Sequence, residues 1–156
     1  MSQNYTIQAR DTRYYVTSSQ CDVDGQIVAT ADGSGGTVPQ GATLTFNKAV
    51  NPNGGVTGVT VKGINGLYIA LDPIVDSFRP EIPQNATTDH KLVWSTKPTN
   101  WQVDPTATPF NGYYVIIPEG LDLFWFTDKN IGPIVQVKSG GQLAGTENQW
   151  TLAKVE

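Results

Sequence analysis

One short run with apolar residues at its first and third positions occurs three times along the chain, at intervals of about 54 residues. The three runs are Tyr5-Thr6-Ile7, Val59-Thr60-Val61 and Tyr114-Val115-Ile116. Alternation with a period of two is typical of a strand that buries one face. A repeat of this length indicates an array or a pseudo-symmetric barrel, and it limits the possible folds more than any other feature.

Three further strand-like segments follow each of these runs, separated by turn residues such as Asn65-Gly66, which suits a two-residue hairpin. Second strands are expected at 13–16, 67–70 and 123–126, third strands at 26–29, 91–94 and 134–137, and fourth strands at 43–46, 100–103 and 149–152. The sequence therefore predicts an all-β fold, a β-trefoil of about twelve strands in three pseudo-symmetric four-strand repeats. Phe46, Trp101 and Trp150 are expected to form layers of one threefold core.

The composition agrees with a single domain over residues 1–156. The chain has 38% hydrophobic residues, 16 Gly and 10 Pro but only 15% charged residues. These proportions favour strands and turns over helices, and the length is sufficient to bury one core. No segment reads as a linker, because the strand pattern continues across every loop.

Charge and hydropathy exclude several classes of partner. The formal net charge of −4 leaves no excess of Lys and Arg to neutralise a phosphate backbone, so we expect no nucleic acid. There is no apolar run long enough for a membrane helix, and the first residues lack the pattern of a signal peptide. We therefore expect a cytoplasmic, monomeric protein that binds no membrane.

The sequence shows no recognisable catalytic or metal-binding set. His90 is the only histidine and Cys21 the only cysteine, so a triad or a metal site would lack partners. Asp22-Val23-Asp24-Gly25 begins like a calcium loop but lacks the later ligands. We expect no enzymatic activity, no cofactor and no metal, and a function that depends on loops displayed by a rigid barrel.

The last 65 residues or so resemble a known family. The stretches KLVWSTKPTNWQVDPT, NGYYVIIPEGLDLFWFTDKNIGPIVQV and NQWTLAKV are similar to the mushroom serine protease inhibitors of the cospin and cnispin type. The matching residues are mainly strand aromatics and turn formers. The resemblance implies a β-trefoil that inhibits trypsin-like serine proteases, without saying which loop does so.

A basic side chain on an exposed, stiff loop is what an acidic specificity pocket would accept. Lys129 meets this description best, in a protease-binding loop of Asp128, Lys129, Asn130 and Ile131 that Pro133 stiffens. The alternative loop is Phe78, Arg79 and Pro80, where the proline would hinder cleavage after the arginine. The hypothesis is an inhibitor that occupies the protease active site with Lys129.

The alternative function is carbohydrate binding, since a lectin site combines an aromatic platform with Asp and Asn side chains. Two groups could form one. They are Tyr113 with Asn111 and Asp122, and Tyr68 with Asn65 and Asp72. A structural or storage protein without a specific ligand stays open as a third possibility.

Overall fold

The structure is a computed structural model, and it describes residues 2–18, 23, 25–32, 41–72, 91–107, 109–127, 134–138 and 145–155. Within these residues all the regular secondary structure is β, in thirteen strands of one sheet. The strands are β1 (Gln3–Ala9), β2 (Tyr14–Thr17), β3 (Val28–Asp32), β4 (Leu44–Phe46), β5 (Val56–Val59), β6 (Val61–Lys62), β7 (Tyr68–Asp72), β8 (Lys91–Ser95), β9 (Trp101–Pro105), β10 (Tyr114–Pro118), β11 (Phe124–Phe126), β12 (Gln136–Lys138) and β13 (Trp150–Lys154).

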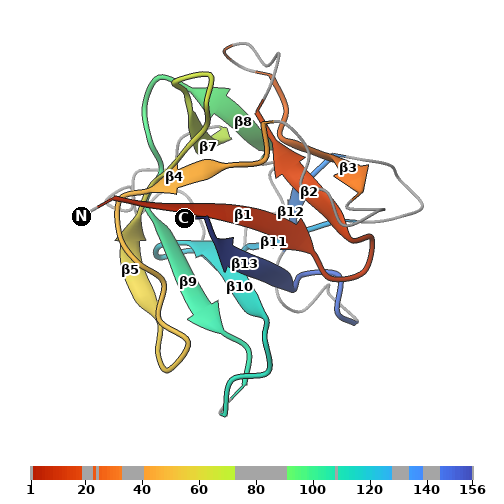
Figure 1. The fold of residues 1–156 in the computed structure, drawn as a ribbon. Coiled ribbons are helices and arrows are strands. Elements are labelled where there is room, and N and C mark those ends of the chain that lie inside the picture. The colour runs from red at the N-terminus through yellow and green to blue at the C-terminus, as the bar shows by residue number, and fades with distance from the viewer. Residues whose placement is uncertain are drawn as a thin grey trace.

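The first and fourth strands of the three repeats close into a barrel. β1 pairs with β4 and β13, β9 pairs with β5 and β10, and the ring is completed by β4 with β6 and β10 with β13. Figure 1 shows β1, β13, β10 and β9 side by side on one wall of this barrel. Closure leaves no free edge in the ring, which is the physical advantage of a barrel over an open sheet.

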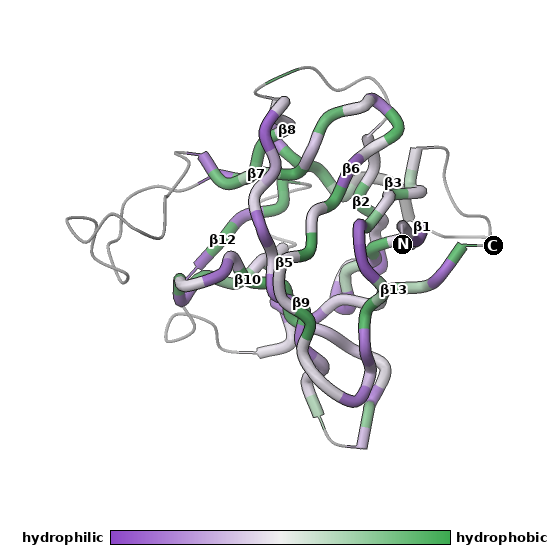
Figure 2. Tube along the Cα trace, turned by 90° about the vertical axis from the view of Figure 1, so that its left-hand side faces the viewer, coloured by the Kyte–Doolittle hydropathy of each residue, from purple (hydrophilic) through white to green (hydrophobic). Residues whose placement is uncertain are grey.

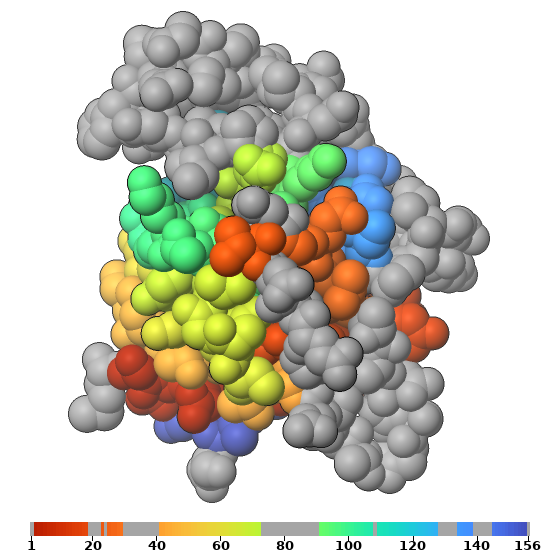
Figure 3. Space-filling view, turned by 90° about the horizontal axis from the view of Figure 1, so that it is seen from above, coloured from red at the N-terminus to blue at the C-terminus, as the bar shows by residue number. Residues whose placement is uncertain are grey.

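The second and third strands form three hairpins that cap the barrel: β2 with β3, β7 with β8, and β11 with β12. Each hairpin touches both of the others, through the pairs Gln26 with Val93, Val28 with Ile134 and Gln136 with Lys91. Figure 3 shows surface from the early, middle and late parts of the chain meeting on the face seen from above. The predicted β-trefoil is confirmed by this arrangement.

The structure has one strand more than the twelve predicted. The first strand of the second repeat is divided into β5 and β6 at Thr60, whose N–H is bonded to the side-chain oxygen of Asn47 at 2.8 Å. The pairing of β5 with β9 also shifts register between Val56 and Val59. Gly58 lies within this irregularity at a φ of +70°, a conformation that glycine adopts without steric cost.

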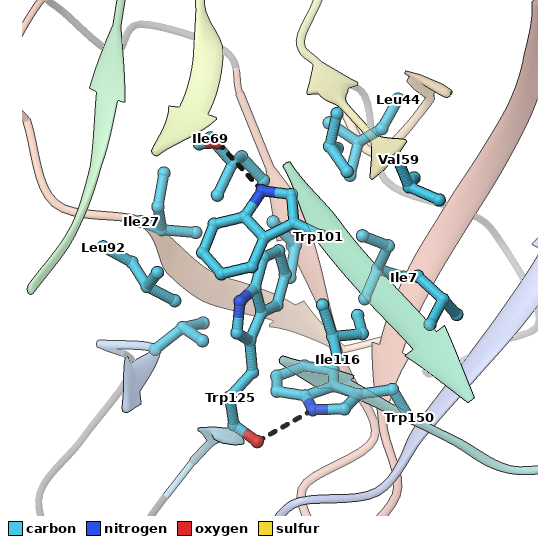
Figure 4. Packing of buried hydrophobic residues seen from close by; sticks show 14 of the residues in the cluster. Ile7, Ile27, Leu44, Val59, Ile69, Leu92, Trp101, Ile116, Trp125 and Trp150 are labelled. Atoms are coloured by element: carbon cyan, nitrogen blue, oxygen red, sulfur yellow. Dashed lines mark hydrogen bonds between the residues drawn. The ribbon is translucent and has the colours of Figure 1, made fainter. Parts of the chain in front are cut away.

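The three aromatic residues predicted for the core, Phe46, Trp101 and Trp150, are fully buried. The two indole N–H groups donate to backbone carbonyls, Trp101 to Ile69 and Trp150 to Trp125, both at 3.1 Å (Figure 4). These bonds satisfy polar groups that would be costly to bury alone. The apolar and polar segments that alternate along the strands in Figure 2 reflect the same division between core and surface.

The strand register refines the predicted symmetry of the core. The equivalent pairs across neighbouring strands are Phe46 with Val61, Val103 with Ile116, and Leu152 with Ile7. Trp101 and Trp150 each lie two residues before the fourth-strand member of its pair, and the residue at that place in the first repeat is Leu44. Leu44, rather than Phe46, is therefore the symmetry mate of the two tryptophans.

Candidate functional site

The same register makes the ends of the three first strands equivalent. Each first strand contributes one member of a matched pair, and the residue three positions after that member is Arg10, Ile64 or Glu119. The N–H of Arg10 donates to the carbonyl of Gln149 at 3.0 Å, and the N–H of Glu119 donates to that of Asn100 at 3.2 Å. We call these two places the Arg10 corner and the Glu119 corner.

The Arg10 corner combines a cation, an aromatic ring and an amide. The guanidinium carbon lies 4.1 Å from the centroid of the Tyr113 ring, and Nη1 donates to Oε1 of Gln149 at 2.5 Å. All three side chains are partly exposed. Stacking on an aromatic face and a hydrogen bond to its head both restrict the arginine, so the planar group is held in one orientation at the surface.

The loop between β9 and β10 ends in a turn that places Asn111 close to Tyr113. The side-chain oxygen of Asn111 accepts from the hydroxyl of Thr106 at 2.7 Å and from the N–H of Tyr113 at 3.2 Å. The base of the loop is closed by the N–H of Thr106, which donates to the carbonyl of Tyr113 at 3.0 Å. Asn111 is exposed, and Gly112 supplies a φ of +97°. The asparagine is thus held beside the tyrosine by its own local hydrogen bonds.

Next to Arg10 lies an acidic residue from the same turn. The carboxylate of Asp11 accepts a hydrogen bond from the hydroxyl of Thr146, which precedes β13. This contact joins the turn after β1 to the segment before β13, as the backbone bond from Arg10 to Gln149 does. The corner therefore carries hydrogen-bonding groups of both charges within a rigid backbone frame.

The Glu119 corner has the same backbone bond but a different use of the side chain. Oε2 of Glu119 accepts the N–H of Gly58 at 2.5 Å. Lys48 donates from Nζ to the carbonyl of Thr57 at 2.8 Å, and a Cβ added to Gly58 would lie 2.9 Å from this Nζ. Because the carboxylate is bonded to the molecule's own backbone, we interpret this corner as structural.

The structure unites only part of the first predicted sugar site. Tyr113 and Asn111 belong to one turn, as described above, but Tyr113 immediately precedes β10 and Asp122 follows its far end. The five residues of β10 extend over about 16 Å, so Asp122 lies too far away to share a monosaccharide with Tyr113. The polar side chains found beside Tyr113 are those of Arg10 and Gln149, and not that of Asp122.

The second predicted sugar site lies along β7. Tyr68 and Asp72 are four residues apart on one strand and therefore face the same side, about 13 Å from each other. Nζ of Lys62 is 5.5 Å from the Tyr68 ring centroid. Oδ1 of Asn65 accepts the N–H of Leu67 at 3.0 Å, so this asparagine stabilises the turn before β7. The group is more dispersed than the Arg10 corner.

Trp101 and Trp150 do not serve as sugar platforms, because both rings are fully buried. The predicted protease-binding loop, Asp128, Lys129, Asn130 and Ile131, lies outside the described residues. So do the alternative loop of Phe78, Arg79 and Pro80, and Cys21 and His90. The inhibitory loops therefore stay predictions.

The described part of the chain holds no group of three or more His, Cys, Asp or Glu side chains arranged to bind a metal ion. Over the same residues there is no helix long and apolar enough to cross a membrane.

Comparisons with solved structures find the same fold over nearly the whole chain. A ricin B-like lectin from Macrolepiota procera, in complex with lactose, aligns with a TM-score of 0.67 and 14% identity over 98% of this chain and 96% of the lectin. The designed threefold-symmetric protein ThreeFoil aligns with a TM-score of 0.67 and 8% identity over 97% and 99%. SeviL, bound to the asialo-GM1 saccharide, aligns with a TM-score of 0.58 and 12% identity over 100% of both chains.

No protein-family model and no curated protein matches the sequence. At these identities the structural likeness establishes the β-trefoil fold and nothing more specific. None of the three neighbours is described as a protease inhibitor, so the resemblance to the cospin and cnispin type gains support for its fold alone.

Sequence reasoning found Tyr113 and Asn111 but missed Arg10 and Gln149. Both missed residues stand next to strand ends, more than 100 positions apart, and no local pattern connects them. The available signal was the repeat itself: the first strand of a β-trefoil pairs with the last one, here β1 with β13, and this pairing brings Arg10, directly after β1, beside Gln149, directly before β13.

Proposed function

We propose that this chain is a carbohydrate-binding protein and that the Arg10 corner, with Arg10, Tyr113, Gln149 and Asn111, is its binding site. The observation that carries the proposal is the ordered contact of the Arg10 guanidinium with the Tyr113 ring and the Gln149 amide at the surface. Such a corner offers an aromatic surface for the apolar face of a sugar and planar donors for its hydroxyl groups.

The fold supports this reading over protease inhibition. Two of the neighbours that align along their full length are described in complex with a saccharide, lactose in one and asialo-GM1 saccharide in the other. A rigid barrel also suits weak, specific recognition, because a site that is ordered before binding loses little conformational entropy when the ligand arrives.

The Asn111 turn adds a polar edge to the site. The side-chain oxygen of Asn111 accepts hydrogen bonds from the Thr106 hydroxyl and the Tyr113 N–H. These two bonds fix the orientation of the amide group, and therefore the position of its nitrogen. An amide nitrogen donates and does not accept, so it suits a hydroxyl or ring oxygen of a sugar. The tyrosine and the asparagine are thus presented as a unit by one turn.

The test is a glycan array with the wild-type protein, followed by calorimetry on the best ligand with Tyr113→Ala and Tyr68→Ala. We expect Tyr113→Ala to weaken binding by about tenfold or more, because truncating an aromatic anchor removes most of the contact area at a site. Tyr68→Ala removes a half-buried tyrosine from the β7 face and serves as the matched control.

Two results would contradict the proposal: an array without a competable ligand, or a ligand whose affinity falls with Tyr68→Ala and not with Tyr113→Ala. The second would move the site to β7. A parallel titration of trypsin decides the other prediction. Inhibition by the wild-type protein that is lost in Lys129→Ala would favour a protease inhibitor.

A further inference from the structure

We infer that the Arg10 corner selects saccharides that carry a carboxylate, and that the carboxylate binds to the guanidinium of Arg10. This inference rests on the proposed function and specifies its class of ligand. It goes beyond sugar binding in general, because a neutral hexose and its 6-carboxylate differ only in the group that would meet the arginine.

The first argument is the way in which Arg10 is held. Its backbone N–H donates to the carbonyl of Gln149, its Nη1 donates to the side chain of the same residue, and its guanidinium carbon lies 4.1 Å from the centroid of the Tyr113 ring. A free arginine loses much side-chain entropy when it binds an anion, but here the two side-chain contacts, with Gln149 and Tyr113, have already restricted it. The structure thus presents an ordered cation at the surface.

The second argument is the chemistry of the group. A guanidinium has five N–H donors in a planar fork that matches the two oxygens of a carboxylate, and Gln149 accepts from one nitrogen of the fork. Gln149 is a neutral partner and leaves the positive charge of Arg10 uncompensated by that bond. Asp11, the acidic neighbour in sequence, accepts a hydrogen bond from Thr146 across the turn.

The third argument comes from the Glu119 corner. At the equivalent position the charged side chain is bonded to the molecule's own backbone, where Gly58 offers an N–H at 2.5 Å. In the Arg10 corner the residue equivalent to Gly58 is Tyr113, whose ring contacts the guanidinium. One corner therefore uses its charge internally, and the other holds its charge on a partly exposed aromatic face.

The experiment compares methyl galactoside with methyl galacturonoside, and methyl glucoside with methyl glucuronoside, by NMR titration of the full chain at low and high salt. For one of the two pairs we expect the acid to bind about tenfold more tightly than its neutral partner at low salt, since a charge-assisted bidentate contact is stronger than a neutral one. The preference should shrink as salt increases, because a surface charge pair is screened.

The variants are Arg10→Gln, Arg10→Lys and the matched control Arg13→Gln, which removes the same charge from an exposed residue of the same turn. We expect the preference for the acid to vanish in Arg10→Gln, to persist in Arg13→Gln and to be reduced in Arg10→Lys, which keeps the charge and loses the fork. A thermal melt of each variant verifies that the domain is folded.

Equal affinities for acid and neutral sugars in the wild-type protein would overturn this inference and leave the proposed function intact, as would a preference that survives Arg10→Gln. Binding of inorganic phosphate as tight as that of the acidic sugar would also overturn it, because it would reveal a general anion site. If none of the four sugars and no array glycan binds, the proposed function fails and this inference fails with it.

Discussion

The Arg10 and Glu119 corners occupy equivalent places in two repeats and share one backbone hydrogen bond, yet their side chains behave differently. In the Glu119 corner the carboxylate is bonded to the N–H of Gly58. In the Arg10 corner the guanidinium lies on Tyr113 at the surface. The barrel determines the main-chain bonds of a corner, whereas the side chains at its surface are free to become either a brace or a binding site.

The residue facing the corner decides between these outcomes. Gly58 has no side chain and exposes its N–H to Glu119, whereas Tyr113 covers the same place with a ring. The third equivalent residue, Ile64, takes neither course: its N–H donates to Oγ of Ser18 at 3.0 Å, and its side chain is 60% exposed. Threefold symmetry of the backbone therefore does not extend to the side-chain contacts at the three corners.

The largest effect is expected from the two buried tryptophans that stand next to the corners in sequence. Trp150 follows Gln149 and Trp101 follows Asn100, and each indole is buried and bonded to a carbonyl. We expect Trp150→Ala and Trp101→Ala to lower the free energy of unfolding by similar amounts, about 3–5 kcal/mol each, because both create a large cavity. Urea unfolding measures this. If one variant loses less than half of the unfolding free energy that the other loses, the two repeats are not equivalent in the core.

A smaller effect is expected at Gly58. Gly58→Ala places a side chain at a φ of +70° and a Cβ 2.9 Å from Nζ of Lys48. The backbone strain should cost about 1–2 kcal/mol, and Lys48 can move because the contact is with the end of a flexible chain. Tyr113→Ala should change stability by less than this, while weakening the proposed sugar binding by about tenfold or more.

The double variant Lys48→Met with Gly58→Ala separates the two causes in urea unfolding. If the strain of the backbone is responsible, the cost of the Gly58→Ala change stays the same in the Lys48→Met background. A cost that disappears in that background would assign the effect to the lysine instead.

The smallest expected effect concerns alkaline pH. Burial raises the pKa of the Tyr114 phenol above its ordinary value of 10.0, and the nearby Tyr5 raises this pKa further. The protonated phenol is favoured in the folded state, so its contribution to stability is complete below pH 10 and is lost as the pH rises through the folded-state pKa. Tyr114→Phe should therefore reduce the loss of stability above this pH.

Thermal melts between neutral and strongly alkaline pH measure this dependence, with Tyr68→Phe as a control that removes a phenol elsewhere. Val59 follows Gly58 in the Glu119 corner as Tyr114 follows Tyr113 in the Arg10 corner. Because valine does not titrate, the alkaline sensitivity should arise beside the Arg10 corner and not beside the Glu119 corner. An unchanged alkaline decline in Tyr114→Phe would contradict this assignment.

Much of the fold could be predicted because it depends on local patterns. The period-two runs around Ile7, Val61 and Ile116 and the turn at Asn65-Gly66 carry their information within a few residues. The division of one first strand into β5 and β6 could not be foreseen, because it depends on Asn47 reaching Thr60 from another strand. The replacement of a core tryptophan by Leu44 was equally hidden until the register was known.

The sequence by itself determined the fold class, the threefold repeat, the number of strands to within one and the presence of Tyr113 and Asn111 in one turn, since each depends on residues close together in the chain. The tertiary structure alone decided that Arg10 lies on Tyr113 beside Gln149, and that Asp122 does not. Such contacts depend on how barrel closure aligns strands distant in sequence, and residue spacing does not encode that alignment.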